Sequence, residues 1–415
     1  MRLAVLCACV LMLLPRAAAA QPEVRFPPPS FRAGEFRIDF RARFHLDFRG
    51  LDAEEPVAPE GFVFRRARVA IEGRIYDDLE YELDRDLRDD KRPWRDVFLN
   101  YRKFRAAEVQ GGKFKVPFSL DQLTSVFSNS FVSRSLIGTQ LAPGRDRGVM
   151  VHGRLAGDRV RYRGGWFKHD GDNTLFTEEL EENEFVEKPP VNNTIAGRVD
   201  LTPWEQTKGL RRRLQIGINA TSGELDDGLF GMRGRTVGGY TFFAPMYVGG
   251  RRMRFGMDGL WTPGPFSVVA EYNRVTDQRN RQGLGDVDLP DVIAEGWYLA
   301  GTWALTGERK SGGIDRPRHP IFQGGAGGVE IAARFEEMRF SSAGTGGEDP
   351  FTNPRAANIL PNRDRAITLG VNWYLNEFAR VLFNAVRETI QDPVRSPLAD
   401  RTRFWTGVVR LQFGM

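Results

Sequence analysis

The sequence predicts an all-β fold, a 16-stranded antiparallel transmembrane β-barrel with long outer loops and an inward-folded third loop. Residues 36–48 show the pattern behind this prediction, because large apolar and charged side chains alternate along them. Successive side chains of a strand point to opposite faces, so such a strand is apolar on one face and ionic on the other. The pattern recurs to the end of the chain, as in a barrel that meets lipid outside and water inside.

Residues 1–20 have the features of a secretory signal peptide. Arg2 gives a positive start, residues 3–14 are apolar, and alanines at 18–20 suit cleavage before Gln21. The apolar stretch is too short for the alternative, a membrane anchor. The only cysteines, Cys7 and Cys9, lie inside this segment, so we expect neither disulfides nor thiolate metal sites in the mature chain.

The mature chain is predicted to be a short leader followed by one barrel. Residues 21–34 contain three consecutive prolines and read as a stiff Pro-rich leader, and residues 35–415 read as the porin barrel. Sixteen segments are predicted strands, an even number that suits a single-chain bacterial barrel. They lie near 36–48, 62–75, 78–85, 94–104, 108–115, 147–155, 158–168, 194–201, 210–220, 252–262, 265–275, 295–307, 328–340, 364–376, 378–388 and 402–413.

The links between these segments alternate between short and long, which is the asymmetry of periplasmic turns and outer loops. Short links include 76–77, 156–157, 263–265 and 376–377. The long links are 49–61, 116–146, 169–193, 221–251, 276–294, 341–363 and 389–401. The link 309–327 departs from the rule, because it falls on the short side and is long.

Composition agrees with a barrel and draws attention to arginine. The net charge is +5 and lysine occurs at only eight positions, so most bases are arginine. The planar guanidinium suits phosphate and carboxylate, although a GC-rich genome would also enrich arginine. Mean hydropathy is −0.40, and no later stretch is long and apolar enough for a transmembrane helix.

The residues for an enzyme are missing from the sequence. No HExxH or GxSxG motif occurs. Strand parity turns His45 and His152 toward the water-filled interior, whereas an outer-membrane hydrolase needs its acid–base set at the lipid-facing rim. The chain is therefore predicted to be no enzyme and to need no cofactor or metal. The acidic run 178–184 reads as a solvated outer loop, or as a cation-mediated contact with lipopolysaccharide.

The candidate anion-binding residues are bases that share the water-facing parity. Arg66, Arg68 and Arg74 of the second strand face acids of the third, and pairs Arg74–Asp78 and Arg68–Asp84 would neutralise two of them as wall structure. The first and seventh strands and one lysine pair have less local acid. They supply Arg37, Arg41, Arg43, Arg159, Arg161, Arg163, Lys113 and Lys115.

The link 116–146 is predicted to fold inward and narrow the pore, because its many apolar side chains would not remain in water. It carries Arg134, Arg145 and Arg147. Charges more than about 8 Å apart are largely screened at physiological salt, so a narrow ring of arginine discriminates more strongly than a wide one. The alternative is that Asp146 simply pairs with the neighbouring arginines.

Two segments resemble the phosphate-selective porin O and P family: GKFKVPFSL at 112–120 and APGRDRGVMVHG at 142–153. Weaker matches follow in order at 197–199, 297–298, 305–308, 329–334 and 369–376, so the resemblance covers roughly 35–413. It implies a sixteen-stranded trimeric porin whose third outer loop narrows the channel, and whose best-known members pass phosphate and polyphosphate along an arginine ladder. Residues 127–140 depart from the selective members, so no ladder position is carried over.

We therefore expect a passive porin in the outer membrane of a Gram-negative bacterium. Small anions, phosphate or polyphosphate first, are the expected substrates, and outer-membrane lipid and lipopolysaccharide are the expected surroundings. A homotrimer is expected, and no nucleic acid. The alternatives are a general or organic-anion porin without phosphate selectivity, and a non-conducting structural or adhesive barrel.

Overall fold

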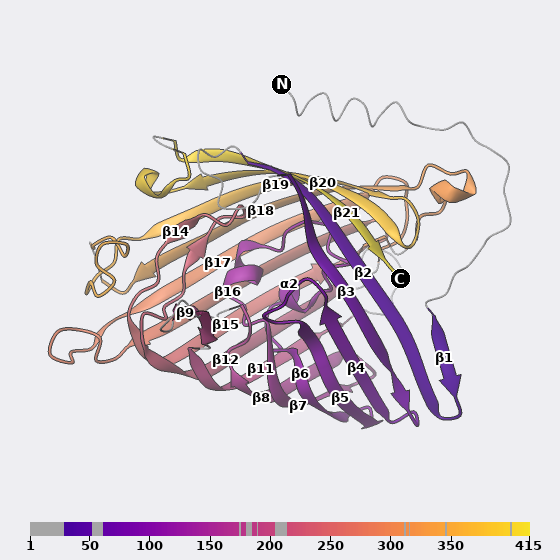
Figure 1. Cartoon of the computed structure of the whole chain (residues 1–415), viewed down its shortest axis with the longest axis horizontal. Helices are drawn as coiled ribbons and strands as arrows, with labels where there is room; N and C mark the ends of the chain where they lie inside the picture. Colours follow the sequence, from indigo (N-terminus) through magenta and orange to yellow (C-terminus); the bar gives the residue numbers. More distant parts are fainter. Residues whose placement is uncertain are drawn as a thin grey trace.

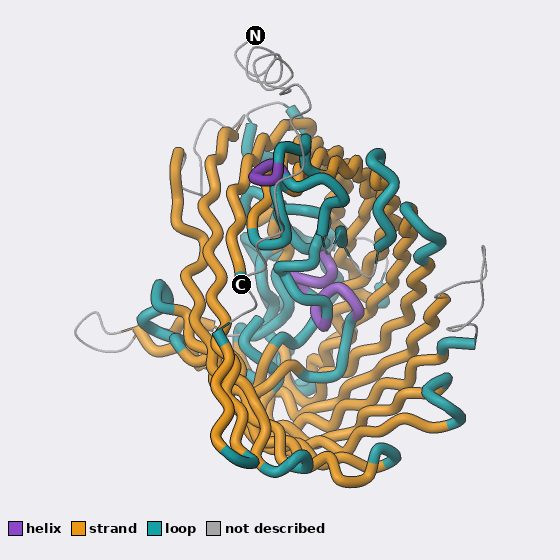
Figure 2. Tube along the Cα trace, turned by 90° about the vertical axis from the view of Figure 1, so that its right-hand side faces the viewer, coloured by secondary structure: helices purple, strands orange, loops and turns teal. Residues whose placement is uncertain are grey.

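A computed structural model of the chain shows one closed antiparallel β-barrel (Figures 1 and 2). The structure describes residues 29–51, 61–173, 176–179, 185–188, 190–203, 214–310, 313–314, 316–344, 347–398 and 401–415. The predicted signal peptide, most of the leader and most of the acidic run 178–184 lie outside the described residues. The end of the leader forms a short strand, β1 (Ser30–Ala33), which pairs with β2.

Sixteen strands form the barrel wall within the described residues. Each pairs with its neighbours along the chain, and β2 closes the barrel against β21. They are β2 (Phe36–Leu51), β3 (Gly61–Ile75), β4 (Leu79–Asp86), β5 (Trp94–Phe104), β6 (Ala107–Lys115), β7 (Arg145–Leu155), β8 (Val160–His169), β11 (Val191–Leu201), β12 (Leu214–Gly228), β15 (Val248–Trp261), β16 (Phe266–Arg279), β17 (Leu289–Ala304), β18 (Gly328–Ser342), β19 (Asn362–Tyr374), β20 (Ala379–Ile390) and β21 (Arg403–Gly414).

The predicted strand count is confirmed, whereas several bounds differ. The prediction placed one strand at 210–220 and another at 295–307, but β12 reaches Gly228 and β17 begins at Leu289. Both extra lengths lie at the long-loop end of the barrel. The extension of β12 is mostly polar or small, and that of β17 begins LPDVIA, in which apolar and polar side chains do not alternate. The alternation that marks a lipid-facing strand is therefore lost before the hydrogen-bonded ladder ends.

Alternation along each strand separates a lipid-facing surface from a charged interior. On β18, Ile331 and Phe335 are exposed, whereas Arg334 and Glu336 between and beside them are buried. A barrel in a membrane needs this distribution, because its outside meets hydrocarbon. None of the described helices is long and apolar enough to cross a membrane.

Short and long links gather at opposite ends of the barrel. Turns such as 76–78 and 105–106 lie at one end, and the links 116–144, 229–247 and 343–361 lie at the other. By the rule for such barrels, the short-turn end is periplasmic. The link 305–327 departs from the rule, as predicted, and contains η3 (Ile321–Gln323). Its buried Lys310 is ion-paired with Glu330 of the inner wall, Nζ to Oε2 at 2.5 Å.

Two outer segments fill part of the interior (Figure 2). Residues 116–144 carry α2 (Leu120–Leu123) and α3 (Leu136–Gln140), and residues 229–247 carry β13 (Gly234–Arg235) and β14 (Thr241–Phe243). Side chains of both segments join one apolar cluster with inward residues of β16–β21. Charged side chains that stay partly accessible inside the barrel therefore concentrate on β2–β8, for example Arg41 and Glu72.

The links 170–190 and 391–402 complete the described elements. The first holds the hairpin of β9 (Phe176–Glu179) and β10 (Phe185–Lys188), and the second holds η4 (Pro393–Arg395).

Candidate pore constriction

Side chains of the inner wall hold the segment 116–144 by its backbone. The Asp121 N–H donates to Glu271 at 3.0 Å, the Leu136 N–H to Glu336 at 2.6 Å, and the Val132 N–H to the Asn384 side-chain oxygen at 2.7 Å. The acceptors come from β16, β18 and β20, so the segment is attached across several strands. Buried N–H groups need such partners, which explains why acidic residues face the interior here.

The two short helices of this segment begin at serine caps. Ser119 accepts from the Gln122 N–H at 3.2 Å, and Ser135 accepts from the Gly138 N–H at 3.0 Å. A capping hydroxyl satisfies a donor that has no partner within the helix. Asp121 accepts both the N–H and the hydroxyl of Ser135, at 2.9 and 2.8 Å, and so ties the start of α3 to α2.

Arg134 and Lys115 converge on one backbone carbonyl. Arg134 donates to Thr124 O at 2.6 Å, and Lys115 donates to the same oxygen at 3.2 Å and to Leu123 O at 2.9 Å. The nearest carboxylate of Arg134 is Asp121, at 3.4 Å, and that group already accepts from Ser135. Burial lowers the pKa of Arg134 below its ordinary value, against the opposing effect of Asp121 and together with repulsion from Arg145.

Arg43 and Arg66 are basic side chains in this part of the lumen that no ion pair with a described residue holds. Within the described residues neither makes an ion pair, and Arg43 lies 5.6 Å from the centre of the Phe127 ring. His45 of β2 pairs across the ladder with Arg66, and both its ring nitrogens are buried without a hydrogen-bond partner. His45 therefore lies directly across from Arg66 and two residues along β2 from Arg43, and neither arginine forms an ion pair with a described carboxylate.

Sequence reasoning missed Arg66 because it assumed the wrong strand register. In the structure Arg68 pairs with Asp86 and Arg74 with Glu80, two residues away from the predicted partners. The ion pair of Arg68 forms at 3.3 Å to Asp86, the last residue of β4. Arg66 lies beyond that point and has no acid opposite it. A pairing search that allowed a shift of two residues would have found this signal.

The first strand was predicted to have few acidic side chains near its arginines, and this prediction is wrong for Arg37 and Arg41. Arg37 pairs with Asp39 at 2.9 Å. Arg41 hydrogen-bonds to Glu72 and Glu82 and lies 3.7 Å from Asp84. Acids of the next two strands reach Arg41 because they share its inward parity.

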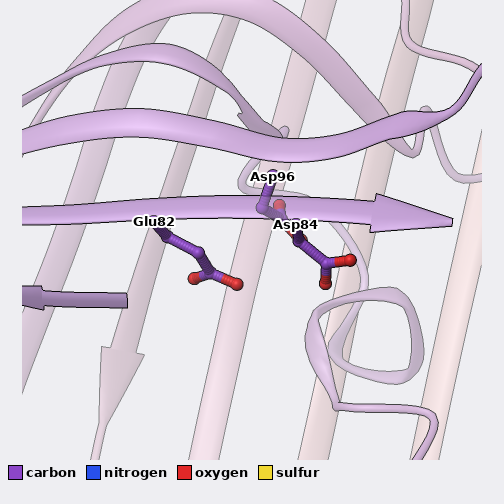
Figure 3. A group of neighbouring side chains, drawn as sticks. All are labelled: Glu82, Asp84 and Asp96. Carbon is purple, nitrogen blue, oxygen red and sulfur yellow. The ribbon is translucent and has the colours of Figure 1, made fainter. Parts of the chain in front are cut away.

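Three inward carboxylates, Glu82, Asp84 and Asp96, lie together on β4 and β5 (Figure 3). Their oxygens lie within 4.8 Å of one another, a spacing that could suit a metal ion. Two arginines already form ion pairs with this group. Arg41 bonds to Glu82, and Arg145 bonds to both carboxylate oxygens of Asp96, at 2.7–3.1 Å. The trio therefore acts as the counter-charge that fixes these guanidinium groups.

The side chains of Arg145 and Arg147 lie on different faces of the barrel wall, although both were predicted to belong to the constriction. The alternative that Asp146 neutralises them is wrong, because Asp146 accepts the backbone N–H groups of Arg147 and His169, at 2.7 and 2.6 Å. Arg145 turns inward to Asp96. Arg147 is exposed and shares the parity of the exposed Val149, so it lies on the outer face and not in the lumen.

The remaining predicted residues lie near the two ends of the barrel. Lys113 donates to Trp94 O at 2.9 Å. Arg159 is exposed in the turn before β8 and is not a strand residue. Arg161 donates to Gln215 at 3.4 Å, and Arg163 pairs with Asp200 at 3.4 Å. Of the predicted set, Lys115 and Arg134 meet at Thr124 O of the inward segment, and Arg43 lies beside Phe127 of the same segment.

These features define a membrane-spanning porin barrel with an internally folded outer loop. The chain belongs to the phosphate-selective porin O and P family, which matches residues 36–413. Porin O of Pseudomonas aeruginosa is 24% identical over 367 residues, 84% of this chain and 82% of the relative. The protein is an outer-membrane porin of a Gram-negative bacterium, and its family and fold indicate a channel and not an enzyme.

Solved structures share this fold at low sequence identity. The outer-membrane channel DcaP of Acinetobacter baumannii has a TM-score of 0.57 at 8% identity, covering 93% of this chain and 99% of that one. OmpT, an outer membrane protein of Vibrio cholerae, has 0.56 at 12%, with 93% and 99% covered. An anion-selective porin from Comamonas acidovorans has 0.55 at 11%, with 92% and 100% covered.

Proposed function

We propose that the protein lets small anions diffuse passively across the outer membrane, with phosphate or polyphosphate favoured. One observation carries this proposal: Lys115 and Arg134 donate to carbonyls of the inward segment, Arg43 lies beside Phe127 of that segment, and neither Arg43 nor Arg66 forms an ion pair within the described residues. Positive charge that carboxylates neutralise only in part attracts anions into a narrow lumen. The similarity to the anion-selective porin from Comamonas acidovorans and membership of the phosphate-selective porin O and P family support the same function.

Phosphate suits this arrangement better than a halide does. Guanidinium groups bind phosphate oxygens with two parallel N–H bonds, and one phosphate can use several donors at once. Conduction also needs binding that is weak enough, over several sites, for the ion to leave. Donors already shared with carbonyls would bind weakly, because an incoming phosphate must compete for them.

A homotrimer is part of the proposal. The family resemblance implies it, and one structure of the Vibrio cholerae OmpT is described as a trimer form. Outer-membrane lipid would surround such a trimer.

Single-channel conductance in a planar bilayer, first in chloride and then with phosphate titrated in, tests the proposal. We expect an anion-selective current that phosphate blocks at millimolar or lower concentration. Lys115→Gln should weaken the block roughly several-fold, because it removes one charged hydrogen bond of about 1.5–3 kcal/mol at most. Glutamine keeps a donor but is one atom shorter than lysine, so heat-modifiability on gels checks that the variant barrel is folded.

Lys113→Gln is the matched control. That lysine also donates to one carbonyl, Trp94 O, but lies outside the cluster of Lys115 and Arg134. Equal effects of both substitutions would contradict the assignment of Lys115. A conducting channel that ignores phosphate would favour the general or organic-anion porin. Absence of any current from a folded barrel would favour the structural or adhesive alternative.

A further inference from the structure

A row of arginine side chains lies on the outer surface of the barrel, the surface that strand parity turns toward lipid. We call it the outer arginine belt, and its two acidic members are Glu295 and Glu337. On β17–β19 the same faces carry Trp297, Phe335 and Ile367, all exposed. The belt therefore lies on the outer surface and not in the lumen. Its arginines are Arg274, Arg339, Arg363, Arg365, Arg387 and Arg403.

The belt crosses neighbouring strands in register. Arg274, Glu295, Arg339 and Arg363 are direct cross-strand partners from β16 to β19. The next row contains Glu337, Arg365 and Arg403, and the third contains Arg387 beside Trp405. Figure 1 shows β17–β21 side by side, in orange to yellow.

Positive charge exceeds negative charge in the belt. Glu295 forms ion pairs with both Arg339 and Arg274, the latter at 3.3 Å. Glu337 forms ion pairs with both Arg365 and Arg363. Arg387 lies 6.0 Å from the Trp405 ring, and neither it nor Arg403 makes an ion pair within the described residues. The side chains of Arg339 and Arg365 are 59% and 48% exposed. Their remaining donors are available to a ligand.

The energetics of a lipid-facing arginine place the belt at headgroup level. An outward arginine strongly destabilises a barrel at the bilayer midplane and is nearly neutral near the interface. Six outward arginines on one face are therefore compatible with a stable barrel only if they lie near the interface. Trp297 and Trp405 lie at the boundary between the belt and the apolar surface, where amphipathic rings are typical. The belt lies toward the long-loop ends of its strands, so the relevant leaflet is the outer one.

An apolar groove adjoins the belt on the same strands. It has a volume of about 1040 Å³. Small residues form much of its floor, namely Gly50, Gly407, Ala385, Ala333 and Gly301, and Leu369 lies in register between Ala385 and Ala333. Larger side chains, including Phe48 and Trp303, border the row. Arg387 lies only two residues from Ala385, about 7 Å along β20.

We propose that the belt and groove together bind a phosphorylated glycolipid of the outer leaflet, with its headgroup phosphate on the arginines and an acyl chain in the groove. The charge complementarity favours this occupant, because guanidinium forks bind phosphate bidentately. Basic residues near an anionic lipid surface strengthen its binding. A free phosphate would have no use for the apolar groove.

Binding of lipid A to the purified folded protein tests this inference. The probes are bis-phosphorylated lipid A and its dephosphorylated form, with the bound lipid counted by native mass spectrometry. We expect at least a tenfold preference for the phosphorylated form. R339Q/R365Q/R387Q should remove most of that preference. R251Q is the matched control, because Arg251 is an exposed arginine on β15 that donates to Ser222 and lies outside the belt.

A second variant tests the groove alone. Gly301→Leu places a side chain over the floor, where no heavy atom lies within 4 Å of the new Cβ position, so the barrel should fold. It should weaken binding of both lipid forms several-fold. Equal binding of the two forms by the wild type, or no effect of the triple variant, would overturn the proposal.

Two further outcomes identify other occupants. Complete competition by inorganic phosphate would show a free-anion site, and disulfide capture between two copies carrying Arg387→Cys would show a protein contact. Either result overturns the lipid assignment. The single-channel conductance of the triple variant should match that of the wild type, so this test can fail without affecting the proposed anion pathway.

Discussion

The inner wall of the barrel uses arginine in two different ways. On β11–β16, Arg252 and Arg254 are fully buried, and both bond to Asp170, while Arg252 also binds Asp277 through two bonds of 2.6 and 2.8 Å. On β2–β8, arginines are partly accessible and unevenly paired: Arg41 lies near three acids, whereas Arg66 forms no ion pair within the described part of the chain. An inward arginine is therefore a structural strut in one region and a candidate anion ligand in the other. The number of carboxylates around each guanidinium decides between them.

Asp277→Ala should produce the largest effect. It leaves the buried Arg252 with Asp170, at 3.3 Å, as its one remaining carboxylate among the described residues, and breaking such a buried pair costs about 3–5 kcal/mol of the free energy of unfolding. Urea unfolding of the barrel in detergent would measure it. Glu72→Gln, on the accessible side, should cost about 1 kcal/mol or less, because Arg41 keeps Glu82 and the site is partly solvated. Equal losses would erase the distinction between the two regions.

Arg43→Gln combined with Arg66→Gln should weaken phosphate block of the channel about tenfold, which corresponds to about 1.4 kcal/mol. Both charges lack an ion pair within the described residues, so their removal leaves no buried carboxylate unpaired. The bilayer titration measures the effect. Arg161→Gln is the control, because that side chain bonds to Gln215 outside this cluster. An unchanged block would show that the pair is not on the anion path.

Asp96→Asn should raise the preference for anions roughly threefold, measured from the reversal potential in a salt gradient. Asp96 neutralises Arg145 through three short contacts, and the amide removes that negative charge while keeping the size of the side chain. Since charges in a narrow lumen are weakly screened, one freed arginine should be detectable. A fall in anion preference would show instead that Asp96 is needed to hold Arg145 in place.

Arg147→Gln should have the smallest effect. The residue is exposed on the outer face, so phosphate block should change less than twofold and the free energy of unfolding by less than about 0.5 kcal/mol. Heat-modifiability on gels and the bilayer titration together check both values. A strong loss of block would place Arg147 in the lumen and revise the parity of β7.

Part of the candidate site could be predicted from the sequence. The apolar side chains of 116–146 predicted inward folding, and this brought Lys115 and Arg134 under consideration. Arg66 escaped because its freedom depends on where β4 ends relative to β3. Arg147 was misplaced because it was counted with the constriction loop, although it begins the predicted strand 147–155. In the structure β7 begins at Arg145, and Arg147 lies on an outward strand face.

The sequence alone determined the barrel, its sixteen strands and its two unlike ends. Lipid and water impose their alternation on every strand locally, so each strand can be recognised without its neighbours. Only the tertiary structure decided which arginines are neutralised. That choice depends on cross-strand register and on contacts between residues far apart in the chain, such as Arg410 with Asp47 at 2.6 Å. A shift of one or two residues moves an acid away from its base while leaving the alternation intact.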